Sequence, residues 1–137
     1  MKKMLLLLTI ICLDITTVFG KDIFAFKKDK INVQGRIMTV LVADTDKKRE
    51  QGLSYTEAAA LKRHAIDGML FIFDNDEEKI FQSWYMKFDL VLLSLEKRQT
   101  RTFDIVERKI LNIGTTTRIK GKYVLEIPLI NNSILGK

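Results

Sequence analysis

Four side chains within six consecutive positions have the chemistry of a small binding site: Trp84, Met86, Lys87 and Asp89. An aromatic wall beside one cation and one carboxylate can orient a polar ligand by stacking and by charge. The favoured alternative is structural: on a core strand, Trp84 and Met86 alternate onto one inward face while Lys87 and Asp89 pair at its end. We therefore take the four residues as ligand-binding candidates and assign no catalytic residue.

An enzymatic alternative would use Asp89 and Lys87, with Glu126 as a third group, in a small hydrolase or lyase. Such a general base requires a perturbed pKa inside a cleft. The only histidine, His64, follows two basic residues at the expected end of a helix, and no Gly-x-Ser-x-Gly motif is present. These features favour an exposed His64 over a catalytic triad. The sequence thus leaves enzymatic activity as the lesser hypothesis.

The sequence predicts neither a metal site nor a cofactor. Met69 and Met86 could offer thioether ligands to copper, but copper sites usually add histidine or cysteine, and neither lies near in the sequence. The acidic run at residues 74–78 begins like a calcium loop. That loop requires glycine where Lys79 stands and glutamate where Tyr85 stands. We interpret the run as a turn.

The first 20 residues have the pattern of a secretory signal peptide. Lys2 and Lys3 are followed by the apolar run Met4–Leu13, then Asp14 and a short segment ending at Gly20. The apolar run has only about half of the roughly 20 residues that a membrane-spanning helix needs. We therefore predict cleavage after Gly20, export to the periplasm or the exterior, and no membrane span in the mature chain; an uncleaved anchor is the alternative.

The remaining composition is that of an ordinary exported domain. Without Lys2, Lys3 and Asp14 the chain keeps 21 basic and 16 acidic residues, a net charge of +5. The two signs are interspersed, which indicates a solvated surface, and nucleic acid is not an expected partner of an exported protein. The only cysteine, Cys12, lies in the signal segment. The hydrophobic core must therefore carry the stability without disulfides.

Hydrophobic patterning predicts a mainly β domain. The expected strands are residues 36–43, 68–73, 80–86, 90–95, 100–106 and 118–130, the last folded into a hairpin at Gly121–Lys122; short helices are expected at 47–51 and 56–64. Short strands separated by turn signals predict a compact antiparallel sandwich or barrel with one or two short peripheral helices. We divide the chain into a signal peptide (1–20), an N-terminal arm (21–35, with 21–29 expected to be disordered) and one β-rich domain (36–137).

Several motifs in this order resemble the family of domain of unknown function 192, small and often exported prokaryotic proteins. The matching segments are Ala43–Thr45, Arg49, Gly52–Leu53, Gly68–Phe73, Trp84, Met86–Lys87, Asp89–Leu95 and Tyr123–Ile127. The resemblance spans residues 36 to about 130 and implies a β-rich fold. It implies no activity, because none is established for the family.

The chain differs from that family pattern between Lys87 and Asp89, where only Phe88 stands and a loop of relatives is missing. A tight hairpin here would favour a residue with positive φ, and the segment contains no glycine. We therefore predict one bent or bulged strand from Ile80 to Leu95, with Trp84 and Lys87 left open to solvent.

The leading functional hypothesis is a non-enzymatic exported domain that binds a small polar ligand or an envelope protein. The alternatives are the hydrolase or lyase described above and a structural component of the envelope. The sequence does not identify the ligand or the oligomeric state.

Overall fold

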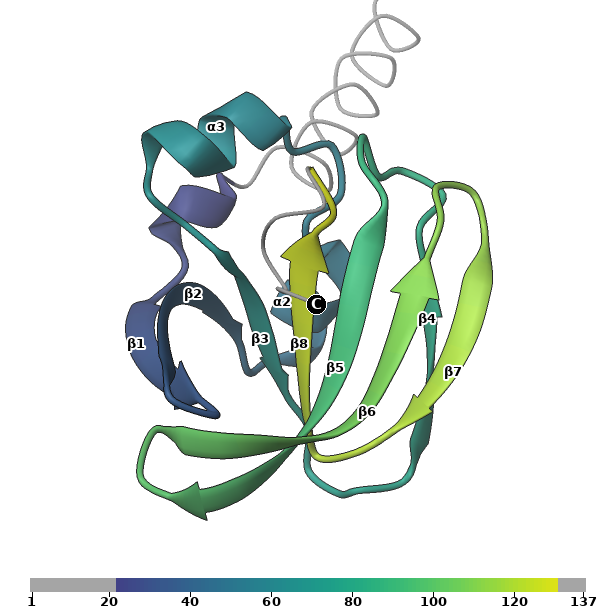
Figure 1. The fold of residues 1–137 in the computed structure, drawn as a ribbon. Coiled ribbons are helices and arrows are strands. Elements are labelled where there is room, and N and C mark those ends of the chain that lie inside the picture. The colour runs from purple at the N-terminus through teal and green to yellow at the C-terminus, as the bar shows by residue number, and fades with distance from the viewer. Residues whose placement is uncertain (1–21, 131–137) are drawn as a thin grey trace, which may run out of the picture.

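The computed structural model describes residues 22–130, which form a closed β-barrel with a small second sheet and short helices (Figure 1). The elements, in chain order, are η1 (Ile23–Ala25), β1 (Lys28–Val33), β2 (Arg36–Ala43), α2 (Asp46–Gln51), α3 (Ala58–Arg63), β3 (Gly68–Ile72), β4 (Glu78–Gln82), β5 (Leu90–Gln99), β6 (Thr102–Leu111), β7 (Thr116–Lys120) and β8 (Tyr123–Pro128). The prediction of a compact, mainly β fold with short peripheral helices is confirmed. The predicted antiparallel sandwich or barrel is a barrel with mixed pairing, since β1–β6 and β2–β3 are parallel.

The barrel runs in the order β1-β2-β3-β8-β5-β6 and closes where β6 meets β1. Strands β1 and β2 form a hairpin whose turn residues Gln34 and Gly35 both have positive φ, as favoured two-residue hairpins require. The pairs β2–β3 and β1–β6 are parallel and the other barrel pairs are antiparallel. The β1–β6 seam is short, with Asn32 opposite Thr102 and Val33 opposite Phe103.

Two apolar clusters lie on the two faces of the barrel wall, because side chains alternate along each strand. The inner cluster takes side chains from all six barrel strands: Ile31, Val33, Met38, Val40, Leu70, Val91, Leu93, Leu95, Phe103, Leu125 and Ile127. The outer cluster includes Leu41, Met69, Phe71, Leu92 and Val124 from the barrel, and Leu53, Leu61, Phe81 and Ile119 from the segments around it. The helices and the β4–β7 sheet therefore cover one side of the barrel.

Two strand predictions near the second sheet are wrong. Strand β4 ends at Gln82 and pairs with β7, whereas β5 begins at Leu90 and lies in the barrel, so residues 80–95 are not one strand. The predicted hairpin at Gly121–Lys122 is not formed either, since β7 and β8 belong to different sheets. Gly121 crosses between the sheets, and a Cβ there would lie 2.4 Å from the Ser94 hydroxyl. This close approach explains the glycine, which the sequence reading assigned to a hairpin turn.

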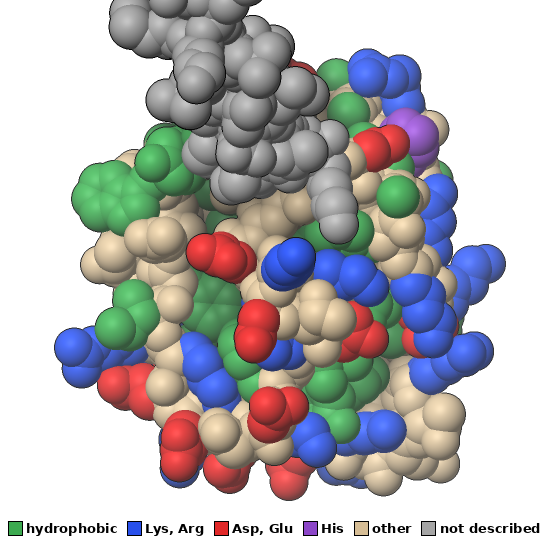
Figure 2. Space-filling model, turned by 180° about the vertical axis from the view of Figure 1, so that it is seen from behind, with side chains coloured by type: hydrophobic (Ala, Val, Ile, Leu, Met, Phe, Trp, Pro, Cys, Tyr) green, Lys and Arg blue, Asp and Glu red, His purple; other side chains and the backbone are tan. Residues whose placement is uncertain are grey.

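The expected disordered arm is also corrected in its described part. Residues 23–25 form η1, with the Asp22 side chain accepting from the Phe24 N–H, and Lys28 begins β1 of the barrel. The predicted signal peptide and residue 21 lie outside the described residues. Among residues 22–130, no helix is long and apolar enough to cross a membrane. Figure 2 shows basic and acidic side chains interspersed on the face opposite that of Figure 1, in agreement with the expected mixed-charge surface.

Candidate functional site

The segment Ser83–Asp89, which we call the Trp84 loop, connects β4 to β5. Trp84 and Tyr85 are each 55% exposed, whereas Met86 and Phe88 are buried in the outer cluster. The expected inward pairing of Trp84 with Met86 is therefore wrong, because the loop is a turn and its side chains do not alternate as on a strand. The prediction that Trp84 and Lys87 are open to solvent is confirmed.

Tyr85 stacks on Tyr55 from the connection between α2 and α3, with ring centroids 5.1 Å apart and planes 19° from parallel. The backbone supports this contact, because the Tyr55 N–H donates to the Tyr85 carbonyl at 2.9 Å. Tyr55 also has a φ of 60°, an uncommon conformation for a residue with a bulky side chain. The structure therefore fixes the position of this exposed ring pair from both sides.

Lys87 and Asp89 do not pair with each other. The Lys87 ammonium forms an ion pair with Glu57, the residue that precedes α3. The Asp89 carboxylate accepts from the Ile113 N–H at 2.8 Å, and its carbonyl accepts from the Leu129 N–H at 2.8 Å. Both charges thus anchor the Trp84 loop to neighbouring segments, and the expected Lys87–Asp89 pair is wrong.

Ser83 provides a further anchor that the sequence analysis missed. Its side chain is fully buried, and its hydroxyl donates to the Asn112 carbonyl at 2.5 Å and accepts from the Thr115 N–H at 3.1 Å. The Ser83 carbonyl accepts from the Gly114 N–H at 3.2 Å. These contacts hold the β6–β7 connection beside the Trp84 loop. A single serine between polar and aromatic residues gave no sequence signal for this role.

These contacts join three connections that each carry exposed apolar side chains, and we call the set Tyr55, Trp84, Tyr85 and Ile113 the aromatic patch. Each of the four side chains is about half exposed. Of the four candidates predicted from the sequence, Trp84 belongs to this patch, Lys87 and Asp89 anchor it, and Met86 supports it from the core. The patch arises because three separate connections meet at one end of the fold.

A second feature of chemical interest is Glu126, on the outer face of β8. Glu126 pairs in register with Met69 of β3 and Leu92 of β5 and is only 4% exposed. Its Oε2 atom has no hydrogen-bond partner among the described residues. Burial raises the pKa of this carboxyl to about 8, because the charged form is costly to desolvate. Sequence reasoning named Glu126 only as a third group of the enzymatic alternative.

The segment above Glu126 is the end of α2. Helix α2 begins after Thr45, whose hydroxyl accepts from the Lys48 N–H, and ends at Gly52 with a φ of 50°. A Cβ at Gly52 would lie 3.8 Å from Glu126 Oε2 and 3.3 Å from Phe71 Cζ. The glycine thus satisfies both the left-handed conformation and the close approach to the carboxyl.

Three phenylalanines surround this region. Phe71 meets Phe81 edge to face at 5.3 Å, and Phe73 lies 6.3 Å from Phe71 and 6.1 Å from Phe81. The Arg49 guanidinium lies 5.4 Å from the centre of the Phe73 ring, and the Lys79 ammonium lies 4.9 Å from it. Desolvation lowers the pKa of Lys79. The aromatic cluster therefore already holds two cations.

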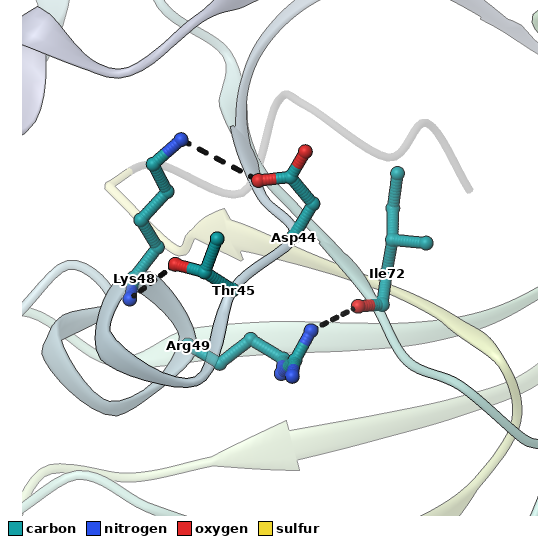
Figure 3. A network of polar contacts seen from close by, with 5 residues as sticks. All are labelled: Asp44, Thr45, Lys48, Arg49 and Ile72. Atoms are coloured by element: carbon teal, nitrogen blue, oxygen red, sulfur yellow. Dashed lines mark hydrogen bonds and ion pairs between the residues drawn. The ribbon is translucent and has the colours of Figure 1, made fainter.

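Arg49 also fastens α2 to the barrel, as Figure 3 shows. Its Nη1 donates to the Ile72 carbonyl at 2.6 Å, and its Nη2 contacts Asp46 at 2.6 Å. Lys48 pairs with Asp44 at 3.4 Å beside the Thr45 cap. The side chains of α2 otherwise lie at the surface, since none of them is buried. Arg49 is therefore a principal attachment of this short helix.

The other groups considered from the sequence have ordinary surroundings. His64 is exposed at the C-terminal end of α3, as expected, and stacks on Phe24 at 3.8 Å between ring centroids. Residues 22–130 contain no group of three or more His, Cys, Asp or Glu side chains arranged to hold a metal ion.

Comparisons with known proteins agree with this fold. The model of the DUF192 family, described as an uncharacterized ACR, matches residues 28–129. A candidate transcription regulator from Sinorhizobium meliloti is 25% identical, with a TM-score of 0.55 over 80% of this chain and 84% of that one. A protein of unknown function from Novosphingobium aromaticivorans is 14% identical, with a TM-score of 0.55 over 82% and 85%. No curated protein is similar enough to the chain to count as a relative.

Proposed function

Because the chain belongs to the DUF192 family, which is uncharacterized, we infer its function from the candidate site. We propose that the protein is an exported, non-enzymatic domain that binds an envelope protein through the aromatic patch. One observation carries the proposal: Trp84, Tyr85 and Tyr55 are half exposed although the Trp84 loop is anchored on several sides and Tyr55 is hydrogen-bonded to it. Exposed apolar side chains that lie together, rather than singly, mark interaction sites.

The residue types favour a protein partner. Tryptophan and tyrosine are enriched among the residues that carry most of the binding energy at protein interfaces, because each buries a large apolar area and keeps one polar group for hydrogen bonding. Small-molecule sites instead bury roughly 70–90% of their ligand in a concave pocket. Rings that are already half exposed suit a broad contact surface better than an enclosing pocket.

The contacts that anchor the Trp84 loop also favour binding, because they order the surface before the partner arrives. Association loses free energy when loops and side chains must be ordered, at about 0.5–1.5 kcal/mol for each immobilised side chain. Lys87, Asp89 and Ser83 already order the Trp84 loop, and the Tyr55 N–H holds Tyr85. The partner would therefore meet a surface that needs little reorganisation.

Export is part of the proposal and rests on residues 1–20, whose charged start and ten-residue apolar run are typical of a signal peptide. The enzymatic alternative has less support, because Lys87 and Asp89 each have a separate structural partner. The observed geometry gives them no shared reacting centre with Glu126 among the described ion pairs and hydrogen bonds.

Site-specific photo-crosslinking tests the proposal. A photoreactive phenylalanine analogue in place of Tyr85 should give one discrete adduct in cells of the native host, and Trp84→Ala should abolish that adduct. The matched control carries the same analogue in place of Ile37, which is 62% exposed on β2, outside the patch. Equal adducts from both positions, or an adduct that survives Trp84→Ala, would contradict binding through the patch.

N-terminal sequencing of the mature protein tests the export part separately. We expect the sequence to begin at Lys21 and the protein to be recovered outside the cytoplasm. A full-length chain beginning at Met1 in the cytoplasmic or membrane fraction would contradict cleavage, whatever the crosslinking shows.

A further inference from the structure

The carboxyl of Glu126 is an unusual group to bury. It lies in an apolar layer with its Oε2 unpartnered among the described residues, although buried polar atoms are generally hydrogen-bonded. Leaving such an atom without a partner costs stability. A hydrophobic residue at this position of β8 would avoid that cost, so the carboxyl calls for an explanation outside folding.

The surroundings of Glu126 are suited to a cation. A Cβ at Gly52 would contact both Phe71 and the Glu126 carboxyl, so the Phe71 ring lies near that carboxyl. Phe71 also belongs to the cluster of three phenylalanines. The faces of aromatic rings attract cations, and Phe73 in this cluster already lies near Arg49 and Lys79. A carboxylate next to aromatic rings is the combination that recognises an ammonium group.

The cover over Glu126 is the turn that ends α2. Helix α2 has no buried side chain, and Gly52 contributes none above the carboxyl, but Gly52 is itself buried and Leu53 after it is fully buried in the outer cluster. A ligand therefore reaches the carboxyl only when this turn opens locally, which costs less than the global unfolding of the domain. The packing of Leu53 and the Arg49 contact to Ile72 limit that movement.

We propose that Glu126 is the buried end of a second binding site, which takes a small ligand with a primary alkylammonium group that enters beside Gly52. The ammonium donates hydrogen bonds to Oε2 and lies against Phe71, and its alkyl chain packs among the apolar side chains around Leu53. A divalent metal ion is a poorer fit, because the hard cations require several oxygen ligands and Glu126 supplies one carboxylate. The site does not depend on the aromatic patch.

Binding has a chemical signature that follows from the buried carboxyl. Near neutral pH Glu126 holds its proton, since burial raises its pKa to about 8. An ammonium beside it favours the charged carboxylate, so the proton leaves for the solvent as the ion pair forms. Each bound ligand should therefore release up to one proton, which makes the calorimetric heat of binding depend on the ionisation enthalpy of the buffer.

The test uses n-butylammonium chloride as the probe and titrates it into the full mature chain. We expect saturable binding with proton release, no comparable binding of the neutral isostere 1-butanol, and no effect of sodium chloride at equal ionic strength. Glu126→Gln keeps the shape of the side chain and should weaken butylammonium binding by about tenfold or more. Glu96→Gln is the matched control, because it makes the same chemical change at an exposed position of β5, and it should bind the probe like the wild type.

If Glu126→Gln does not fold, carbon NMR of wild-type protein labelled at glutamate side-chain carboxyls decides the question. One buried carboxyl should shift on addition of butylammonium and not on addition of 1-butanol. Equal binding of 1-butanol, an unchanged affinity in Glu126→Gln, or the absence of both saturable binding and a carboxyl shift would overturn the proposal. None of these outcomes depends on the crosslinking at Tyr85, so the two sites fail or succeed separately.

Discussion

Replacing Glu126 by glutamine should change how the stability of the domain depends on pH. Burial raises the pKa of this carboxyl to about 8 in the folded protein, from its ordinary value of 4.5. Between these values the folded state keeps a proton that the unfolded state has lost. The free energy of unfolding of the wild type must therefore fall as pH rises from about 4.5 to about 8, and this contribution is fully present only below the lower value.

The size of the effect follows from the shift. Each pKa unit corresponds to about 1.4 kcal/mol, so the loss across this window is of the order of 3–5 kcal/mol, with most of it complete by neutral pH. Glutamine does not titrate, so Glu126→Gln should lack this slope. A constant offset between the two proteins is expected as well, because the amide brings two N–H donors into an apolar layer.

Urea unfolding of both proteins at pH values from about 5 to about 9 measures the difference. The stability of the variant relative to the wild type should increase from about pH 5 to about pH 8 and then level off. Glu96→Gln is the matched control, because it makes the same chemical change at an exposed position of β5 and should follow the wild type. Parallel curves for the wild type and Glu126→Gln would refute the reasoning, since they would mean that the buried carboxyl has a stabilising partner.

Three further predictions address the core and the loop. Phe71→Ala should lower the free energy of unfolding by about 3–5 kcal/mol because Phe71 is buried, whereas Val106→Ala at an exposed position should change it by less than about 0.5 kcal/mol in the same urea titrations. Gly68→Ala should lower the free energy of unfolding by more than about 2 kcal/mol, because its Cβ would lie 2.3 Å from the Glu126 carbonyl oxygen. In the control Gly35→Ala a Cβ meets nothing within 4 Å, so this variant should lose only the strain energy of its positive φ. Equal losses of stability for the two variants in thermal unfolding would show that β3 can move away from β8. Trp84 is the only tryptophan, and its exposed ring should emit at long wavelength and be readily quenched by acrylamide; a blue-shifted, quencher-resistant emission would contradict the exposed Trp84 loop.

The sequence predicted most of the barrel because its strands have a strong local signal. Gly68–Phe73 is apolar on both faces, as expected of a strand covered on both sides. The strand β3 in this segment pairs with β2 on one side and with β8 on the other. The charged run before Gly52 likewise predicted α2, with the glycine at its end. These features depend on residues that are neighbours in the chain.

The errors occur where distant segments determine the structure. Residues 83–89 mix apolar and polar side chains as a strand does, but Met86 and Phe88 turn into the outer cluster and leave Trp84 outside. No local pattern shows that Glu57 and Ile113 hold this loop. The environment of Glu126 was equally hidden, because Gly52 and Phe71, which approach its carboxyl, come from distant parts of the sequence.

The short seam between β1 and β6 has a consequence for the order of folding. Its backbone hydrogen bonds run from the Asn32 N–H to the Arg101 carbonyl at 2.7 Å and from the Gln34 N–H to the Phe103 carbonyl at 3.0 Å, and the Gln34 side chain accepts from the Ile105 N–H. These partners are far apart in the chain, whereas the β1–β2 and β5–β6 hairpins are local. Closing a long loop loses entropy before any contact compensates for it. The hairpins should therefore form first, and the β1–β6 seam that closes the barrel should form last. Protection of the Asn32 and Gln34 amides from hydrogen exchange should then appear last during refolding and mark the completion of the barrel.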